Sequence, residues 1–143
     1  MPAITLALAR QIIDAAVAHA AGAGGPPIAA IVLDSGGFPV AFARQDGSSN
    51  LRYVIAEGKA WAALGLGVSS RALAAVADKA PTFISSMAAA SNGRFVASPG
   101  GLLIADEGGN VIGALGVTGD TSDRDEEHAF AGIAAAGLAV AGI

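Results

Sequence analysis

The sequence contains no cysteine and few charged or aromatic residues. Asp, Glu, Lys and Arg make up 14% of its 143 residues, and aromatic residues make up 5%. The absence of cysteine excludes disulfides, thiolate metal sites and cysteine nucleophiles. The net charge is −4 and the basic residues form no cluster. This argues against nucleic acid as a partner, because its phosphates require a patch of Lys and Arg.

Long apolar runs are also missing. No uninterrupted run reaches the ~18 residues that a membrane-spanning helix needs. The N-terminal stretch lacks the basic segment that precedes the apolar part of a signal peptide. We therefore expect no membrane partner and a cytoplasmic location.

Hydrophobic residues, in contrast, are abundant. They make up 53% of the chain, against about 45–50% in a typical globular domain. The length predicts one domain over residues 1–143. A domain of this size has too little interior for so many apolar side chains. The excess predicts a homo-oligomer, in which apolar surface of one copy meets another copy.

Hydrophobic periodicity predicts an α+β fold. A first helix is expected to follow Thr5, a good N-cap residue, and to end near residue 21. Further helices are expected over residues 51–66, 71–79 (capped by Ser69), 81–87 and 123–140. Strands are expected over residues 28–33, 38–42, 95–98, 102–105 and 111–117. This order predicts an antiparallel sheet with helices packed on it.

Two segments share a hairpin pattern. Residues 31–38 and 103–110 each contain an apolar strand, then an acidic residue, then a Gly-Gly pair. Glycine adopts the positive φ that tight hairpin turns need. Both segments are therefore predicted to be hairpins of the same sheet.

Five segments, in order along the chain, together form a family pattern. They are Gly58-Lys-Ala-Trp-Ala-Ala-Leu64, Ser69-Ser-Arg-Ala-Leu73, Gly93-Arg-Phe-Val96, Pro99-Gly-Gly101 and Gly113-Ala-Leu-Gly-Val-Thr-Gly-Asp-Thr-Ser-Asp123 with Asp125-Glu126. The set resembles the GlcG/HbpS family and the C-terminal domain of PduO-type proteins. The resemblance implies a profilin/PAS-like fold, with a five-stranded antiparallel sheet flanked by helices. It also implies oligomers, and haem or a related tetrapyrrole as the bound group.

Most of the polar residues are concentrated in residues 113–128. A glycine-spaced strand turns there, at residues 118–120, into a helix that begins with acidic residues. Carboxylates are stabilised at a helix N-terminus, and Asp123 with Glu126 fits a capping box. Alternatively, the backbone N–H groups of this turn hold an oxyanion, with Asp120 or Glu126 handling protons. A metal is not expected, because the calcium-loop pattern is absent.

The two histidines, His19 and His128, are the candidate axial ligands of haem. His19 lies late in the first predicted helix, where the dipole also favours a cation for purely structural reasons. His128 lies opposite an apolar stripe that includes Phe130 and Ile133, so we expect it to point to solvent, a cleft or a neighbouring subunit. In the related family we expect a cysteine at this position in many members.

Three basic residues are candidates for anion binding. Lys59 lies in an apolar helix, where a lysine usually extends its amine to water. If it is buried instead, its pKa falls and it can bind an anion or act as a nucleophile. Arg71 and Arg94 can each hold a carboxylate or propionate bidentately, although surface ion pairing is the commoner role.

Three functions fit these features. The first is a small oligomeric protein that binds haem or a related tetrapyrrole through His19, Arg71, Arg94, Thr118 and His128. The second is a cofactor-free enzyme that acts on a small organic acid or carbonyl compound through Lys59, Asp120, Glu126 and His128. The third is a structural or assembly module without a ligand.

Overall fold

A computed structural model describes residues 3–143. Its elements are, in chain order, α1 (Leu6–Gly22), β1 (Ala29–Asp34), β2 (Pro39–Arg44), α2 (Leu51–Leu66), α3 (Ser70–Lys79), α4 (Pro81–Ala90), β3 (Gly101–Ala105), β4 (Val111–Thr118), α5 (Ser122–Ala135) and β5 (Ala139–Ala141). The strands form one antiparallel sheet in the order β2-β1-β4-β3-β5. The predicted profilin/PAS-like α+β fold with a five-stranded antiparallel sheet is confirmed.

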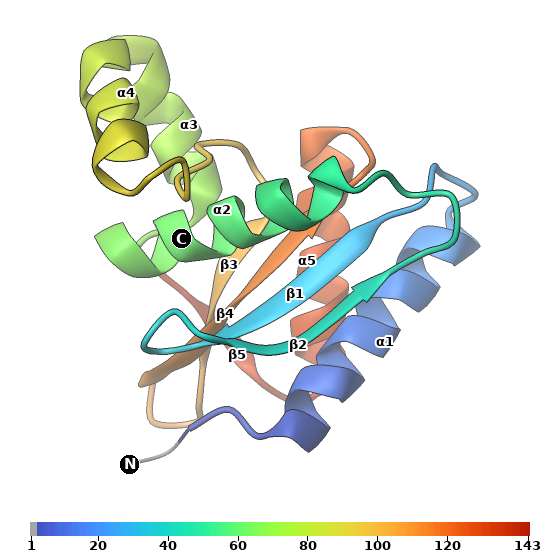
Figure 1. Ribbon diagram of the computed structural model, residues 1–143. Coiled ribbons are helices and arrows are strands. Elements are labelled where there is room, and N and C mark those ends of the chain that lie inside the picture. The colour runs from blue at the N-terminus through green and yellow to red at the C-terminus, as the bar shows by residue number, and fades with distance from the viewer. Residues whose placement is uncertain (1–2) are drawn as a thin grey trace.

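Helices cover both faces of the sheet. Figure 1 shows α2 on one face and α1 beside α5 on the other, while α3 and α4 project beyond the sheet as a pair. In β1, Ala30 and Val32 pack in the core with α1 and α5, whereas Ile31 and Leu33 pack with α2. A wholly apolar strand is typical of burial on both faces.

Local polar contacts begin the helices. The hydroxyl of Thr5 accepts the N–H of Leu8 at 3.1 Å, and that of Ser69 accepts the N–H of Ala72 at 3.4 Å, which confirms both predicted caps. The capping box predicted for Asp123 and Glu126 is wrong. The hydroxyl of Thr121 caps α5 instead, accepting the N–H of Arg124 at 3.3 Å.

Both predicted hairpins are confirmed and share one turn chemistry. In the turn from β1 to β2, Oδ1 of Asp34 accepts the N–H groups of Gly36 and Phe38 at 2.9 and 3.0 Å. In the turn from β3 to β4, Oδ1 of Asp106 accepts the N–H groups of Gly108 and Asn110, both at 2.9 Å. The acidic residue of the pattern therefore organises each turn.

The fifth strand is not the one that the sequence predicts. Residues 95–98 are not a strand; Phe95 is 7% exposed and packs with Leu73 of α3. The missing strand is β5, which pairs with β3. The last helix ends at Ala135 rather than near residue 140, because Gly137 follows with φ +71°, a conformation that ends helices.

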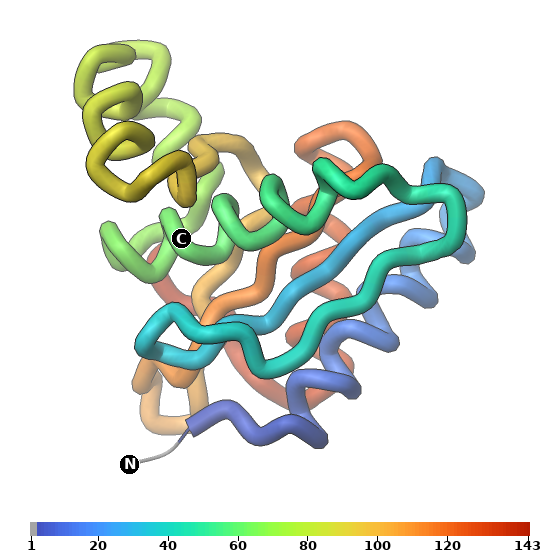
Figure 2. The backbone as a smooth tube through the Cα atoms, in the orientation of Figure 1, coloured from blue at the N-terminus to red at the C-terminus, as the bar shows by residue number. Residues whose placement is uncertain are grey.

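The connections place four chain segments at one end of the sheet. Figure 2 shows the loop from α1 to β1 beside the loop from β2 to α2. The two loops are joined because Oε1 of Gln45 accepts the N–H of Ile28 at 2.8 Å. The end of β4 and the start of α5 lie at the same end, since β4 pairs with β1 through Ala29 and Thr118. Of the candidate residues, Thr118, Asp120, His19 and His128 lie near this end.

Within residues 3–143 no single helix is long and apolar enough to cross a membrane, and only α2 with α3, bent by 82° at their junction, passes that test as a pair.

Candidate functional site

Helices α1 and α5 bring the two histidines into contact. Their Nδ1 atoms lie 2.8 Å apart, and their rings meet edge to face with centroids 5.1 Å apart. His19 is exposed on the last turns of α1, whereas His128 is only 1% exposed. The contact spans 109 residues of sequence. No local pattern could therefore have predicted it.

The prediction that His128 points to solvent, a cleft or a neighbouring subunit is wrong. The buried face of α5 contains Asp125, His128, Ala129, Gly132 and Ile133. Phe130, which was expected in the core stripe, is 37% exposed. The buried face of α5 is therefore rotated away from the predicted apolar stripe. The reason is that α5 packs on α1 through the small residues of α5. Gly132 shows this closeness: an added Cβ there would lie 2.7 Å from the carbonyl oxygen of Ile12.

Asp120 supports the far side of the His128 ring. Its Oδ2 lies 3.3 Å from Nε2 of His128, and its Oδ1 accepts the N–H of Thr121 at 2.7 Å. The hydrogen bond from the Thr121 N–H lowers the pKa of Asp120 against the opposing effect of burial, and His128 lowers it further. Asp120 is therefore an anionic acceptor at neutral pH.

The carboxylate of Asp120 decides which ring nitrogens of His128 and His19 donate a hydrogen bond and which accept one. When His128 is neutral and donates from Nε2 to Asp120, its Nδ1 is an acceptor. His19 must then donate from its own Nδ1, which leaves the lone pair on Nε2. No hydrogen bond within residues 3–143 involves Nε2 of His19. The arrangement thus presents an imidazole nitrogen that is free to bind a metal centre.

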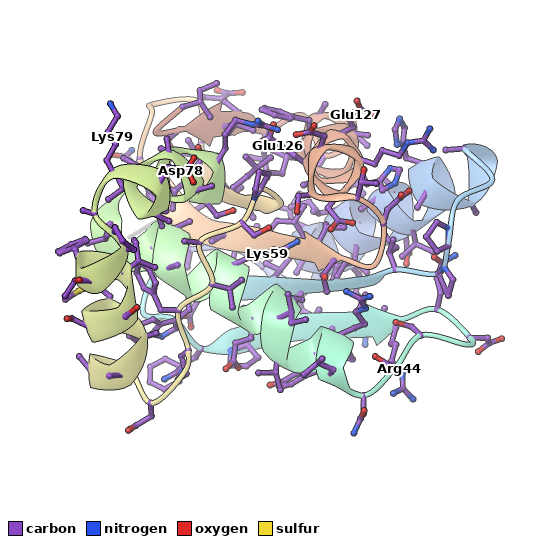
Figure 3. All side chains as sticks on the ribbon, turned by 90° about the horizontal axis from the view of Figure 1, so that it is seen from above. Arg44, Lys59, Asp78, Lys79, Glu126 and Glu127 are labelled. Atoms are coloured by element: carbon purple, nitrogen blue, oxygen red, sulfur yellow. The ribbon has the colours of Figure 1, made fainter. Side chains whose placement is uncertain are left out.

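Lys59 forms a buried ion pair with Asp125. Nζ of Lys59 lies 3.0 Å from Oδ2 of Asp125 and donates to the carbonyl oxygen of Val117 at 3.0 Å. The two residues are 2% and 1% exposed, and Figure 3 shows Lys59 inside the molecule, between α2 and the start of α5. Oδ1 of Asp125 accepts the N–H of Asp120 at 2.9 Å. The pair is thereby connected to the histidines.

The expectation that Lys59 extends to water is therefore wrong. It shares the inward face of α2 with the buried alanines Ala56, Ala60 and Ala63. That run of small residues at helical spacing is the sequence signal for burial. Burial lowers the pKa of Lys59 and raises the pKa of Asp125, while the attraction between the two charges opposes both shifts.

The other predicted site residues lie apart from the histidines. Nε of Arg71 lies 2.8 Å from Glu126, and its Nη2 pairs with Asp123. Nε of Arg94 lies 3.4 Å from Glu57, with the guanidinium over the Trp61 ring. Of the residues predicted for an enzyme, Asp120 and His128 meet directly and Lys59 is linked to them through Asp125. Glu126 belongs to a separate surface group with Arg71.

Sequence reasoning missed two residues of this region. Asp125 was noted as one of several acids, but its pairing with Lys59 was not predicted. Arg52 was not considered at all, yet its Nη1 donates to Oγ1 of the buried Thr118 at 3.2 Å. The seven-residue spacing of Arg52 and Lys59 is two helical turns, so both lie on one face of α2. That spacing was the available signal.

The best-formed surface pockets over residues 3–143 lie elsewhere. None of the four is lined by His19, His128, Lys59 or Asp120. The imidazole of His19 thus stands on an open surface, whereas the ion pair of Lys59 is closed off from solvent.

Comparison with known proteins gives the same fold. A PduOC:haem complex superposes with a TM-score of 0.87 at 23% identity, covering 98% of this chain and 99% of that chain. HbpS superposes with a TM-score of 0.80 at 29% identity, covering 94% and 90%. Protein ORFY of Klebsiella pneumoniae gives 0.83 at 27% identity, covering 94% and 90%. Among curated proteins, none matches the chain.

The family match covers almost the whole chain. A family model described as "haem degrading protein HbpS-like" matches residues 4–134. The matched range contains both histidines, the buried ion pair and all strands except β5. The resemblance inferred from the sequence motifs is therefore confirmed, and the chain belongs to the HbpS-like family.

Proposed function

We propose that this protein is a small oligomeric haem-binding protein in which His19 supplies the axial nitrogen. The observation that carries the proposal is the exposed imidazole of His19, whose Nδ1 is held by a buried partner. Neutral imidazole is a usual ligand of haem iron. The family description and the name of the PduOC:haem complex support haem as the group.

The residues behind His19 fit such a ligand. Metal-binding histidines commonly donate their second ring N–H to an acceptor, which fixes the ring and raises the basicity of the ligating nitrogen. Here the acceptor is Nδ1 of His128, which is held in turn by Asp120. We therefore assign His128 a positioning role, because it is buried and cannot present a nitrogen to a bound group. The haem itself would supply the iron chemistry.

The open surface around His19 bears on the oligomer. His19 is exposed and lines none of the four pockets described above, so one chain would leave much of an apolar macrocycle in water. Coverage by a second copy of the chain would bury that surface.

That Arg71, Arg94 and Thr118 contact the ligand remains a prediction. Both arginines would have to exchange their present carboxylate partners for propionates.

Haemin titration tests the proposal. The purified protein should give a saturable, shifted Soret band with about one haem per His19, since one imidazole per chain is free to bind iron. His19→Ala should abolish the shift. His128→Ala should weaken binding by about 10–100-fold, the usual effect of losing a partner behind a metal ligand.

Gln11→Ala is the matched control. Nε2 of Gln11 donates to the carbonyl oxygen of Ala135 at 3.1 Å, so this variant also removes a hydrogen bond between α1 and its neighbour but leaves both imidazoles. It should bind haemin as the unmodified protein does. A spectrum of free haemin at every ratio, or a His19→Ala protein with an unchanged Soret shift, would rule the proposal out.

A further inference from the structure

A small pocket lies at the end of the sheet where two loops meet the start of α2. It has a volume of about 200 Å³ and is lined by Pro26, Pro27, Gly47, Ser48, Ser49, Arg52 and Gly119. The lining comes from the α1–β1 loop, the β2–α2 loop, α2 itself and the turn after β4, segments that lie side by side in Figures 1 and 2. None of the lining side chains is acidic.

The pocket is rich in hydrogen-bond donors. The Arg52 guanidinium donates to Thr118 from Nη1, and this is its one hydrogen bond within residues 3–143. An arginine has five N–H donors in a planar fork, so a bidentate face is left over. The hydroxyl oxygen of Ser48 is buried and has no partner among the described residues. An unpartnered buried hydroxyl is costly and points to a missing polar partner.

Helix α2 adds to this donor set. It is 16 residues long, and the side chain of Asn50 at its N-cap makes no capping hydrogen bond. The first turn therefore has N–H groups without a side-chain acceptor, at the positive end of the helix dipole.

Among the described residues, Arg52 has no carboxylate partner of its own. Arg52 and Lys59 lie on one face of α2 and contact consecutive residues of β4, Thr118 and Val117. Asp125 is paired with Lys59. No carboxylate in the described part of the chain forms an ion pair with Arg52. The guanidinium of Arg52 is therefore available to an anion from outside the chain.

We infer that this pocket binds a small oxyanion, a carboxylate or a phosphate, through the guanidinium of Arg52 and the hydroxyl of Ser48. The volume lies below the ~300–1,000 Å³ of sites for drug-sized ligands, so the ligand has few heavy atoms. The inference is independent of haem binding, because neither His19 nor His128 lines the pocket.

Amide chemical shifts of the ¹⁵N-labelled full chain test the inference. Acetate, inorganic phosphate and the neutral analogue acetamide are titrated separately. Acetate or phosphate should cause saturable shifts in residues 47–54 and 119, and acetamide should cause none. The anion that binds more tightly identifies the chemical class of the natural ligand.

Three variants connect the shifts to the pocket. Arg52→Gln should weaken binding at least about tenfold, because a charge-assisted hydrogen bond is lost. Arg52→Lys keeps the charge but loses the planar fork and should also weaken binding. Ser48→Ala should weaken binding by a few-fold. Because it keeps the contact between Arg52 and Thr118, this variant still tests the pocket if the arginine variants fail to fold.

Arg44→Gln is the matched control. Arg44 is an exposed arginine at the end of β2 and lies on the outside of the molecule in Figure 3. This variant should bind as the unmodified protein does. The absence of saturable shifts with both anions, equal binding of acetamide, or undiminished binding in Arg52→Gln would each overturn the inference.

Discussion

At the scale of single residues, the ion pair of Lys59 and Asp125 has the largest expected effect on stability. Both side chains are almost fully removed from water, so each is tolerated only because the other neutralises it. Lys59→Met leaves Asp125 as an uncompensated buried charge. We expect a loss of about 3–5 kcal/mol in the free energy of unfolding, measured by urea titration with circular dichroism.

Two further variants separate the charge from the packing in that experiment. Lys59→Met with Asp125→Asn removes both charges and keeps an oxygen that accepts the N–H of Asp120. It should recover much of the loss. Lys79→Met changes an exposed lysine at the end of α3 and should stay within about 0.5 kcal/mol of the unmodified protein. A double variant as unstable as Lys59→Met would show that packing, and not charge, dominates.

The same pair predicts a pH dependence in Asp125→Asn. Burial lowers the pKa of Lys59, and in this variant the opposing attraction of Asp125 is gone. Between the lowered folded pKa and the ordinary unfolded pKa, the unfolded chain binds more protons than the folded one. Stability therefore rises with pH within that window, and below and above it Lys59 contributes no pH dependence.

Urea unfolding at pH 7 and pH 9.5 measures this effect. Asp125→Asn should gain more stability between the two pH values than the variant that carries both Lys59→Met and Asp125→Asn, in which no buried amine titrates. Equal gains in the two proteins would mean that Lys59 is not the group responsible.

At the scale of elements, the contact of α2 with β4 depends on glycine. A Cβ added at Gly116 would lie 2.0 Å from the carbonyl oxygen of Ala56, so α2 lies directly on the strand. Gly116→Ala should force the helix away from the sheet. Because backbone atoms must shift, we expect a loss at the upper end of the about 1–3 kcal/mol typical of overpacking, or beyond it.

Gly65→Ala is the control for this contact. Gly65 also belongs to α2, but nothing lies within 4 Å of an added Cβ. This variant should stabilise the protein by about 0.4–1 kcal/mol, because alanine restricts the unfolded chain. Thermal unfolding distinguishes the two variants by the direction of the shift in Tm. A Gly116→Ala protein with an unchanged Tm would contradict the close approach of α2 to β4.

Elements that depend on neighbouring residues were predictable from the sequence. The caps Thr5 and Ser69 and the turns at Asp34 and Asp106 each form within a few residues, so spacing alone identifies them. The bounds of α2 were predicted correctly for the same reason. Strand β5 was not, because its three residues are defined by pairing with a strand distant in sequence.

The candidate site was less predictable than the fold. The sequence indicated His19, His128, Asp120 and Lys59 as separate candidates, but their connection depends on how α1, α2 and α5 meet. An apolar stripe also fixes the rotation of a helix only coarsely. For α5 this error led to the prediction that His128 points outward, although it lies on the buried face that packs on α1. Resemblance to a known family, in contrast, does not depend on helix rotation.

At the scale of the whole molecule, several large apolar side chains remain exposed, and four of them lie on the first turns of α2 and on the neighbouring β2. Leu51 and Val54, three residues apart on the first turns of α2, are 58% and 52% exposed. Beside them, the ring of Tyr53 contacts the ring of Phe42 from β2, with centroids 4.9 Å apart. We call these four residues the α2–β2 patch. Exposed apolar side chains on neighbouring elements are typical of a surface that meets another protein.

We therefore predict that the protein is a homo-oligomer that uses the α2–β2 patch. Light scattering should give a mass above the 13.8 kDa of one chain. Val54→Asp should lower that mass, because an unpaired charge is costly at an apolar interface. Val76→Asp is the control, since Val76 is a similarly exposed valine on α3, outside the patch, and should leave the mass unchanged.

The outcome also bears on haem binding. If the patch assembles the oligomer and His19 binds iron, Val54→Asp should separate assembly from iron binding. Its smaller particles keep the imidazole of His19 but leave more of the macrocycle in water. Its haemin affinity should then fall without loss of the Soret shift, whereas His19→Ala loses the shift in particles of full size. A mass of one chain at micromolar concentration for the unmodified protein would contradict the assembly, and the exposed residues of the patch would then need another partner.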